Sequence, residues 1–124
     1  MTNQPSINDW SEYLIWAEKN LKDLEDMTLP PGPDGDPDHF DIYQNYEVEA
    51  GKRDALREHL TQNGVRTIIQ WAGTPVHQFK DLGLPKFDLP ATERLFKRCF
   101  LLPMNTSLTN DEVAYICETI RRFY

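Results

Sequence analysis

The sequence predicts an α+β domain in which a small sheet of about three strands packs against helices. Apolar residues recur at helical spacing near both ends of the chain, and alternating apolar residues, typical of strands, occur between them. The chain has 124 residues, the length of one domain, and 40% of them are hydrophobic, enough for a single core. We expect one domain made of a leading helix (1–28), a Pro/Asp loop (29–41) and an α+β part (42–124).

The leading helix is expected to begin near Ser6 and Asp9, which form an S-x-x-D start, and to run to about Asp26. Ile15 and Trp16 lie off its apolar stripe, on the far side of the helix. A helix with apolar residues on two sides is usually covered on both. We expect this pair to face a neighbouring domain, and a stray aromatic at the surface is the alternative.

The Pro/Asp loop resembles a calcium-binding loop only superficially. Asp34, Asp36 and Asp38 alternate along it, but an EF-hand needs Gly at the sixth position and Glu at the twelfth. His39 and Asn45 occupy those positions when the count begins at Asp34. We therefore expect a solvated acidic loop. The histidines of the chain match no zinc-ligand spacing either, so no metal site is predicted.

Two predicted strands flank a short helix in the middle of the chain. Residues 40–48 and residues 65–71 alternate apolar and polar side chains, and residues 52–62 have a helical stripe that ends at Asn63-Gly64. Strand, helix and strand in this compact order predict a βαβ-like unit.

The last third of the chain predicts two helices and a short strand. One helix opens at Leu89-Pro90, after a possible helical turn at residues 78–83, and residues 100–102 form a strand. Thr109 and Glu112 form a capping box that starts the final helix.

The candidate ligand-binding edge lies where the second predicted strand ends. Gln70 and Trp71 precede a turn that contains Gly73 and Pro75, and His77 follows directly after it. A rigid strand can hold such side chains while the turn exposes them. The alternative is an ordinary strand with a capping Trp and a surface His.

The composition excludes several classes of function. A net charge of −7 argues against nucleic-acid and anionic-membrane surfaces, which need clustered Lys and Arg. No apolar run is long enough for a membrane span, and the N-terminus does not resemble a signal peptide. Cys99 and Cys117 are each expected on the apolar stripe of a helix, which favours free thiols in a reducing cytoplasm. No P-loop and no G-x-S-x-G elbow is present.

Five segments, in order, resemble the C-terminal small domain of the DegT/DnrJ/EryC1/StrS family of pyridoxal-phosphate-dependent sugar aminotransferases. They are Arg53-Asp54-Ala55-Leu56-Arg57, the NGVRT run at residues 63–67, the stretch from Gln70-Trp71 to His77, Leu89-Pro90-Ala91-Thr92-Glu93, and residues 101–113. The sequence departs from the family pattern at Gln70-Trp71, where His-Tyr is frequent, and at Asn105, which replaces a frequent His.

The resemblance implies the small domain of a fold type I enzyme that transfers an amino group from glutamate or glutamine to a keto-sugar nucleotide. Gln70, Trp71 and His77 fall where the family lines the substrate side, and we expect them to bind the nucleotide sugar rather than carry protons. The pyridoxal phosphate (PLP) of the full enzyme belongs to a large N-terminal domain that is missing from these residues.

No lysine here matches the Schiff-base lysine of the family. We therefore expect the chain alone to bind no cofactor and to be inactive in transamination, because that chemistry needs a desolvated lysine. The full enzyme is expected to be a homodimer, as the family is. The alternative is a non-catalytic binding or scaffold module that has kept the small-domain fold.

Overall fold

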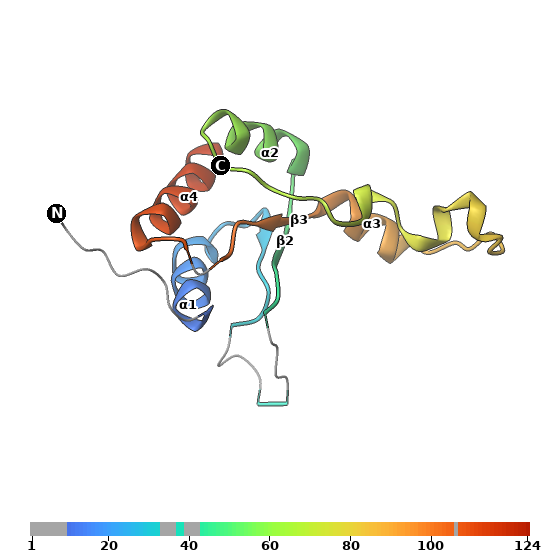
Figure 1. Ribbon diagram of the computed structural model, residues 1–124, viewed down its shortest axis with the longest axis horizontal. Helices are drawn as coiled ribbons and strands as arrows, with labels where there is room; N and C mark the ends of the chain where they lie inside the picture. The colour runs from blue at the N-terminus through green and yellow to red at the C-terminus, as the bar shows by residue number, and fades with distance from the viewer. Residues whose placement is uncertain (1–9, 33–36, 39–42, 106) are drawn as a thin grey trace.

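The computed structural model describes residues 10–32, 37–38, 43–105 and 107–124. Within them the chain forms helices and a small antiparallel sheet, as predicted for an α+β domain (Figure 1). The elements, in chain order, are α1 (Trp10–Leu21), β1 (Met27–Thr28), β2 (Tyr46–Ala50), α2 (Arg53–Gln62), α3 (Pro90–Arg98), β3 (Cys99–Leu102) and α4 (Asn110–Phe123).

The strands lie in the order β1-β2-β3, and both pairs are antiparallel. Met27 of β1 lies opposite Ala50 of β2, and Val48 of β2 lies opposite Phe100 of β3. On the other side of β3, Ile68 forms an isolated antiparallel bridge with Leu101. The sheet therefore continues past β3 by a single residue pair.

The core lies between the sheet and helices α1, α2 and α4, which together form the body of the molecule (Figure 1). Tyr13 of α1 and Tyr46 of β2 meet edge to face, with ring centroids 5.4 Å apart, and the Tyr13 hydroxyl donates to the carbonyl of Pro103 at 2.6 Å. This bond satisfies a hydroxyl that burial would otherwise leave unpaired. The largest fully buried side chains are Tyr13, Tyr46, Phe100, Leu21, Leu56, Leu60, Ile120, Val48, Val113 and Thr119.

The predicted strand at residues 65–71 was wrong, because only Ile68 pairs with a neighbour. Arg57 binds this segment at Thr67. Its Nε donates to the Thr67 hydroxyl at 2.8 Å, and its Nη2 donates to the Thr67 carbonyl at 3.3 Å. Both β2 and this segment are antiparallel to β3, so they run in the same direction with β3 between them. The predicted βαβ-like order is therefore split by a third strand.

The first helix ends at Leu21 rather than near Asp26, because the following residues turn to pair with β2. Arg121 of α4 holds this turn, with one nitrogen donating to the Asn20 carbonyl at 2.9 Å and both donating to the Asp23 carboxylate. This hydrogen bond lowers the pKa of Asp23. The expected S-x-x-D start at Ser6 lies outside the described residues.

Two other boundaries also differ from the sequence prediction. Strand β2 begins at Tyr46, although residues 40–48 were predicted, and Tyr43 has a left-handed backbone with φ 47° that is unsuited to a strand. The beginning of that prediction, at residues 40–42, lies outside the described residues. Cys99 is the first residue of β3, not part of a helix, although it is buried as expected.

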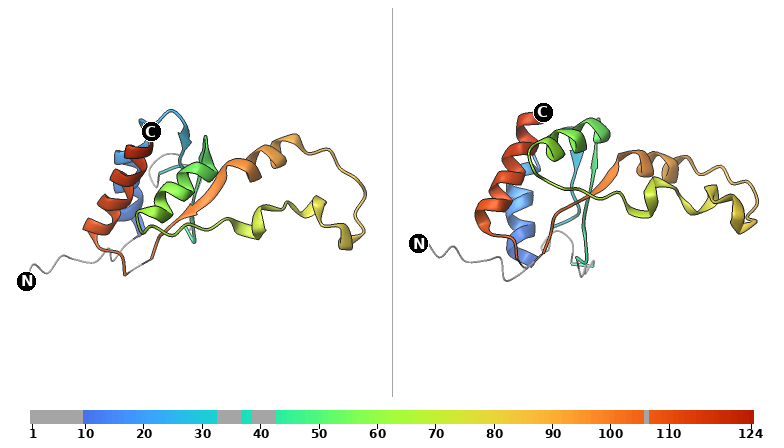
Figure 2. Two further views of the ribbon diagram at one scale, coloured as in Figure 1. Left: turned by 90° about the horizontal axis from the view of Figure 1, so that it is seen from above. Right: turned by 45° about the horizontal axis from the view of Figure 1, so that its top comes forward.

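Residues 70–98 form an arm that projects from the body (Figures 1 and 2). Its outgoing limb contains 3₁₀ turns at Gln70–Gly73, Val76–Gln78 and Lys80–Leu82, and its returning limb contains α3. Among residues 70–98, only Pro75 is buried as a whole residue, and the side chain of His77 is also almost completely buried. The arm therefore has no core of its own.

None of the helices in the described part of the chain could span a membrane.

Helix α4 begins with the predicted capping box. The Thr109 hydroxyl accepts from the Glu112 backbone N–H at 3.2 Å, and the Glu112 carboxylate accepts from the Thr109 N–H at 2.8 Å. These bonds satisfy two backbone donors that would otherwise have no partner in the helix.

Replacing Thr109 by Ala should lower the free energy of unfolding by about 1 kcal/mol, because the cap to α4 is lost. Urea denaturation monitored by circular dichroism would measure the change. Thr61→Ala is the matched control: Thr61 bonds to the carbonyl of Arg57 within α2, and its loss should cost less than about 0.5 kcal/mol. Equal losses in the two variants would contradict the capping argument.

The two free thiols should be unreactive in the folded protein. Burial, reinforced by nearby Glu47, raises the pKa of the Cys99 thiol to about 11, and burial raises that of Cys117 to about 12. At pH 8 on the order of one Cys99 thiol in a thousand would be ionised, and the thiolate is the reactive form. Labelling with a thiol-reactive dye should therefore need unfolding, and rapid labelling of native protein would contradict this.

Candidate functional site

Two arginines of α2 hold the arm at its roots. Arg57 donates to Thr67, just before the outgoing limb begins. Arg53, one helical turn earlier, donates through Nη1 to the carbonyls of Phe96 and Cys99, where the returning limb ends. Hydrogen bonds from charged donors are stronger than neutral ones, so both limbs start from fixed points on the body.

Trp71 is presented at the beginning of the arm. The backbones of Trp71 and Ala72 are both left-handed, with φ values of 56° and 52°, and the Thr74 N–H closes the turn on the Trp71 carbonyl at 3.0 Å. Left-handed backbone is costly for residues other than Gly, and such strain concentrates at functional sites. The Trp71 side chain is 75% exposed. A large aromatic held open in a strained turn is suited to contact a ligand.

An apolar groove of about 570 Å³ lies beside Trp71, between the outgoing limb and α3. We call it the arm groove. Its lining residues are Trp71, Thr74, Pro75, Val76, Phe79, Asp81, Leu82, Thr92 and Phe96. Most of these side chains are apolar, and Val76, Phe79 and Leu82 are between 45% and 63% exposed. The volume and the apolar lining fit a small-molecule site or a docking surface.

His77 lies inside the arm, not at its surface. Its side chain is 4% exposed, and its Nε2 lies 3.2 Å from the Oε1 of Glu93 in α3. Trp71 borders the arm groove, whereas Gln70 and His77 are not among its lining residues. The structure therefore gives His77 an internal contact that joins the two limbs.

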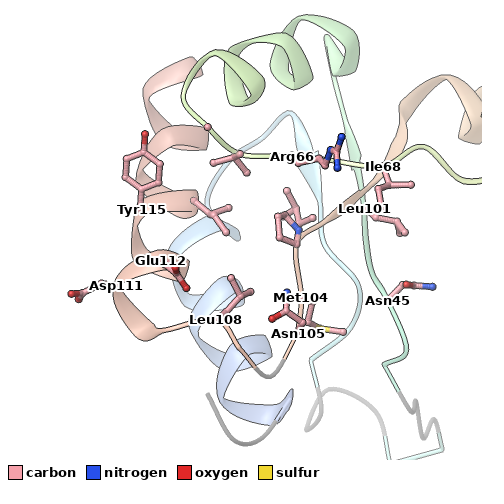
Figure 3. Close-up of a pocket in the computed structure, with 15 residues that line it drawn as sticks. Asn45, Arg66, Ile68, Leu101, Met104, Asn105, Leu108, Asp111, Glu112 and Tyr115 are labelled. Carbon is pink, nitrogen blue, oxygen red and sulfur yellow. The ribbon is translucent and has the colours of Figure 1, made fainter. Parts of the chain in front are cut away.

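A second groove, of about 650 Å³, lies on the body between residues 64–68, the end of β3 and the beginning of α4 (Figure 3). Leu101, Met104 and Leu108 contribute to its apolar lining, while Arg66 and Asp111 lie at opposite sides. The Tyr115 hydroxyl at its edge donates to the Asn63 carbonyl at 2.7 Å. Its polar groups do not converge on one point, so we assign it no chemistry.

The structure also adds residues that the sequence analysis did not single out. Phe79 and Leu82 belong to a segment interpreted only as a possible helical turn, and their exposure could not be read from the sequence. Glu93 was recognised only as part of a family motif. Its contact with His77 joins residues 16 positions apart, and only the folded arm brings them together.

The described residues offer little for metal or covalent chemistry. No group of three or more His, Cys, Asp or Glu side chains among them could hold a metal ion. Asp34, Asp36 and His39 of the Pro/Asp loop lie outside the described residues. Every lysine of the chain is exposed, so none lies in the desolvated surroundings that a Schiff-base lysine needs.

Comparison with known proteins gives consistent matches along the chain. A family model described as the DegT/DnrJ/EryC1/StrS aminotransferase family matches residues 11–121. The erythromycin biosynthesis sensory transduction protein EryC1 of Saccharopolyspora erythraea is 31% identical over 122 residues, which covers 93% of this chain and 32% of EryC1. A pleiotropic regulatory protein of Geobacillus stearothermophilus is 28% identical over 131 residues, covering 97% of this chain and 34% of that protein.

A solved structure shares the fold. DesI, crystallised in the presence of its TDP-sugar product, superimposes with a TM-score of 0.74 and 25% identity, over 90% of this chain and 29% of DesI. The chain thus spans about a third of the length of the relatives that it matches. Both the sequence segments and the fold agree with the expected resemblance: the chain belongs to the DegT/DnrJ/EryC1/StrS aminotransferase family.

Proposed function

We propose that this chain is the C-terminal small domain of a PLP-dependent nucleotide-sugar aminotransferase, and that its arm forms the substrate side of the active-site cleft. The observation that carries the proposal is the exposed indole of Trp71, held in a strained turn beside the arm groove. DesI, which has the same fold, was crystallised with a TDP-sugar, and this supports a nucleotide sugar as the ligand class.

In this proposal Gln70 and Trp71 contact the nucleotide sugar, and neither transfers protons. The flat indole offers a surface on which a base or the apolar face of a sugar can stack. The amide of Gln70 both donates and accepts hydrogen bonds, which suits hydroxyl groups. His77 shapes the same substrate side from within the arm, since its side chain is buried against Glu93.

Pyridoxal phosphate is the cofactor that the family implies, and the residues of this chain do not fit it. The cofactor, when bound, serves as the electron sink for amino transfer, and it needs a lysine in a desolvated site. The exposed lysines here offer no such site. We therefore place the cofactor in a large domain supplied by other residues, and we assign this chain to substrate binding alone.

The arm also supports a large-domain partner. It buries only Pro75 and the side chain of His77, yet it exposes Trp71, Val76, Phe79 and Leu82. Apolar patches of this kind mark interaction sites. On α1, Ile15 and Trp16 are 52% and 36% exposed, so they do not belong to the core of this chain. We propose that these surfaces face the large domain, that the whole enzyme is a homodimer, and that it works in the cytoplasm.

A non-catalytic binding module is the second candidate. Two observations favour it: no lysine of the chain is desolvated, and one relative is described as a pleiotropic regulatory protein. This candidate predicts no preference for a nucleotide sugar at Trp71, so ligand titration separates the two.

Thymidine diphosphate should bind the chain weakly, with a dissociation constant near 1 mM, because only one wall of the cleft is present. In NMR titrations the indole signal of Trp71 should shift, and Trp71→Ala should weaken binding about tenfold, the amount expected for one stacked base. Trp16→Phe on α1 is the matched control and should bind as the parent chain does. Unchanged binding by Trp71→Ala, or no binding by the parent chain, would count against the proposed substrate contact.

Pyridoxal phosphate should not form a specific Schiff base with this chain. After incubation with the cofactor and reduction with borohydride, mass spectrometry should find label spread thinly over several lysines, because all of them are exposed. N-acetyl-lysine at matched concentration gives the reference level of non-specific reaction. One lysine labelled in a one-to-one ratio would show that the cofactor belongs here after all.

A further inference from the structure

Among the described residues, the contact between His77 and Glu93 is the one side-chain hydrogen bond that joins the two limbs of the arm beyond its roots. Glu93 lies in the first turn of α3, and His77 lies in the 3₁₀ turn Val76–Gln78 of the outgoing limb. The imidazole is almost completely buried, whereas the Glu93 side chain is 38% exposed. A buried ring held by a partly exposed carboxylate fixes the separation of the two limbs at this level.

Within the described part of the chain, Glu93 is the one hydrogen-bond partner of the His77 ring. The Nδ1 atom is buried and has no hydrogen-bond partner in the structure, so Nε2 makes the only polar contact of the ring. A proton on Nδ1 would be a buried donor without an acceptor, which is costly. The arrangement therefore suits a ring whose Nε2–H donates to the Glu93 carboxylate.

The position of His77 is transmitted to Trp71 through two consecutive turns. The Gln78 N–H donates to the Pro75 carbonyl at 3.0 Å, and the Thr74 N–H donates to the Trp71 carbonyl at 3.0 Å. Pro75 between them is buried. On the opposite limb, the neighbour of Glu93 in sequence, Thr92, lines the arm groove together with Trp71. The hydrogen bond between His77 and Glu93 thus connects the limb that carries Trp71 to α3, the helix on the opposite limb.

We propose that Glu93 is a positioning residue: through His77 it holds the Trp71 turn against α3, and so shapes the ligand-facing side of the arm. The identity of the ligand in this inference rests on the proposed function, whereas the positioning of Trp71 by Glu93 does not. Glu93 does not contact the ligand in this scheme. The root contacts of Arg53 keep the end of α3 attached when Glu93 is changed, so the arm should remain folded at its base.

The experiment compares three variants of the full chain. Glu93→Ala removes the hydrogen-bond acceptor, and Glu93→Gln keeps an acceptor without the charge. Arg94→Ala changes the exposed neighbour on the same helix and serves as the matched control. The first readout is the NMR indole signal of Trp71 without ligand, and the second is the affinity for thymidine diphosphate. Circular dichroism establishes that each variant is folded.

We expect Glu93→Ala to shift the Trp71 indole signal and to weaken thymidine diphosphate binding about fivefold, the effect of one lost hydrogen bond. Glu93→Gln should restore most of both readouts, and Arg94→Ala should change neither. A merely structural Glu93 would lower the melting temperature without moving the Trp71 signal of the folded protein. That result, or an unchanged signal in Glu93→Ala, would overturn the proposal.

The two proposals fail in different ways. If the parent chain binds thymidine diphosphate and Glu93→Ala changes neither readout, the positioning role is wrong and the proposed function stands. If Glu93→Ala moves the indole signal but no form of the chain binds the nucleotide, the positioning of Trp71 is supported and the ligand assignment is wrong.

Discussion

Two guanidinium groups one turn apart on α2 fix where the arm leaves the body and where it returns. Arg57 holds the backbone at Thr67, and Arg53 holds the carbonyls of Phe96 and Cys99. An arm that buries little beyond Pro75 and the side chain of His77 has too few packing contacts of its own to fix its direction. Its direction is therefore set by the core through α2, whose Leu56 and Leu60 are fully buried. The turn that carries Trp71 depends on that attachment, although it lies outside the core.

The body is held by its own core, whereas the arm is held by contacts from α2. For this reason the sequence predicted the body better than the arm. The capping box of α4 follows from a local pattern and was predicted correctly, and the strand predicted at residues 40–48 overlaps β2 only at residues 46–48. The strand at residues 65–71 could not be excluded locally, because the group that competes for its backbone is a side chain of α2. Strand β1 was missed because its two residues directly follow the helical pattern of the leading segment. Only their pairing with β2 makes them a strand.

The candidate site was only partly visible in the sequence. Trp71 was singled out because an aromatic preceding a Gly/Pro turn is a plausible ligand contact, and its exposure of 75% agrees with that role. Its partners in the arm groove, Phe79 and Leu82, sit in a segment without periodicity, so no pattern marked them. Glu93 became meaningful only when folding placed it against His77. Residues that act through contacts between distant segments leave little trace in one sequence.

The segment from Gln70 to His77 therefore separates into two tasks. Gln70 and Trp71 stand at the beginning of the arm, where a strained and solvent-exposed turn can meet a ligand. The side chain of His77 is buried inside the arm, where it contacts Glu93. The buried imidazole leaves its Nδ1 without a hydrogen-bond partner, but its contact with Glu93 connects the two limbs. A turn that is already held in place loses less conformational entropy when it binds a ligand. In the proposed function, a surface made in this way selects the ligand, and the amino-transfer chemistry comes from residues outside it.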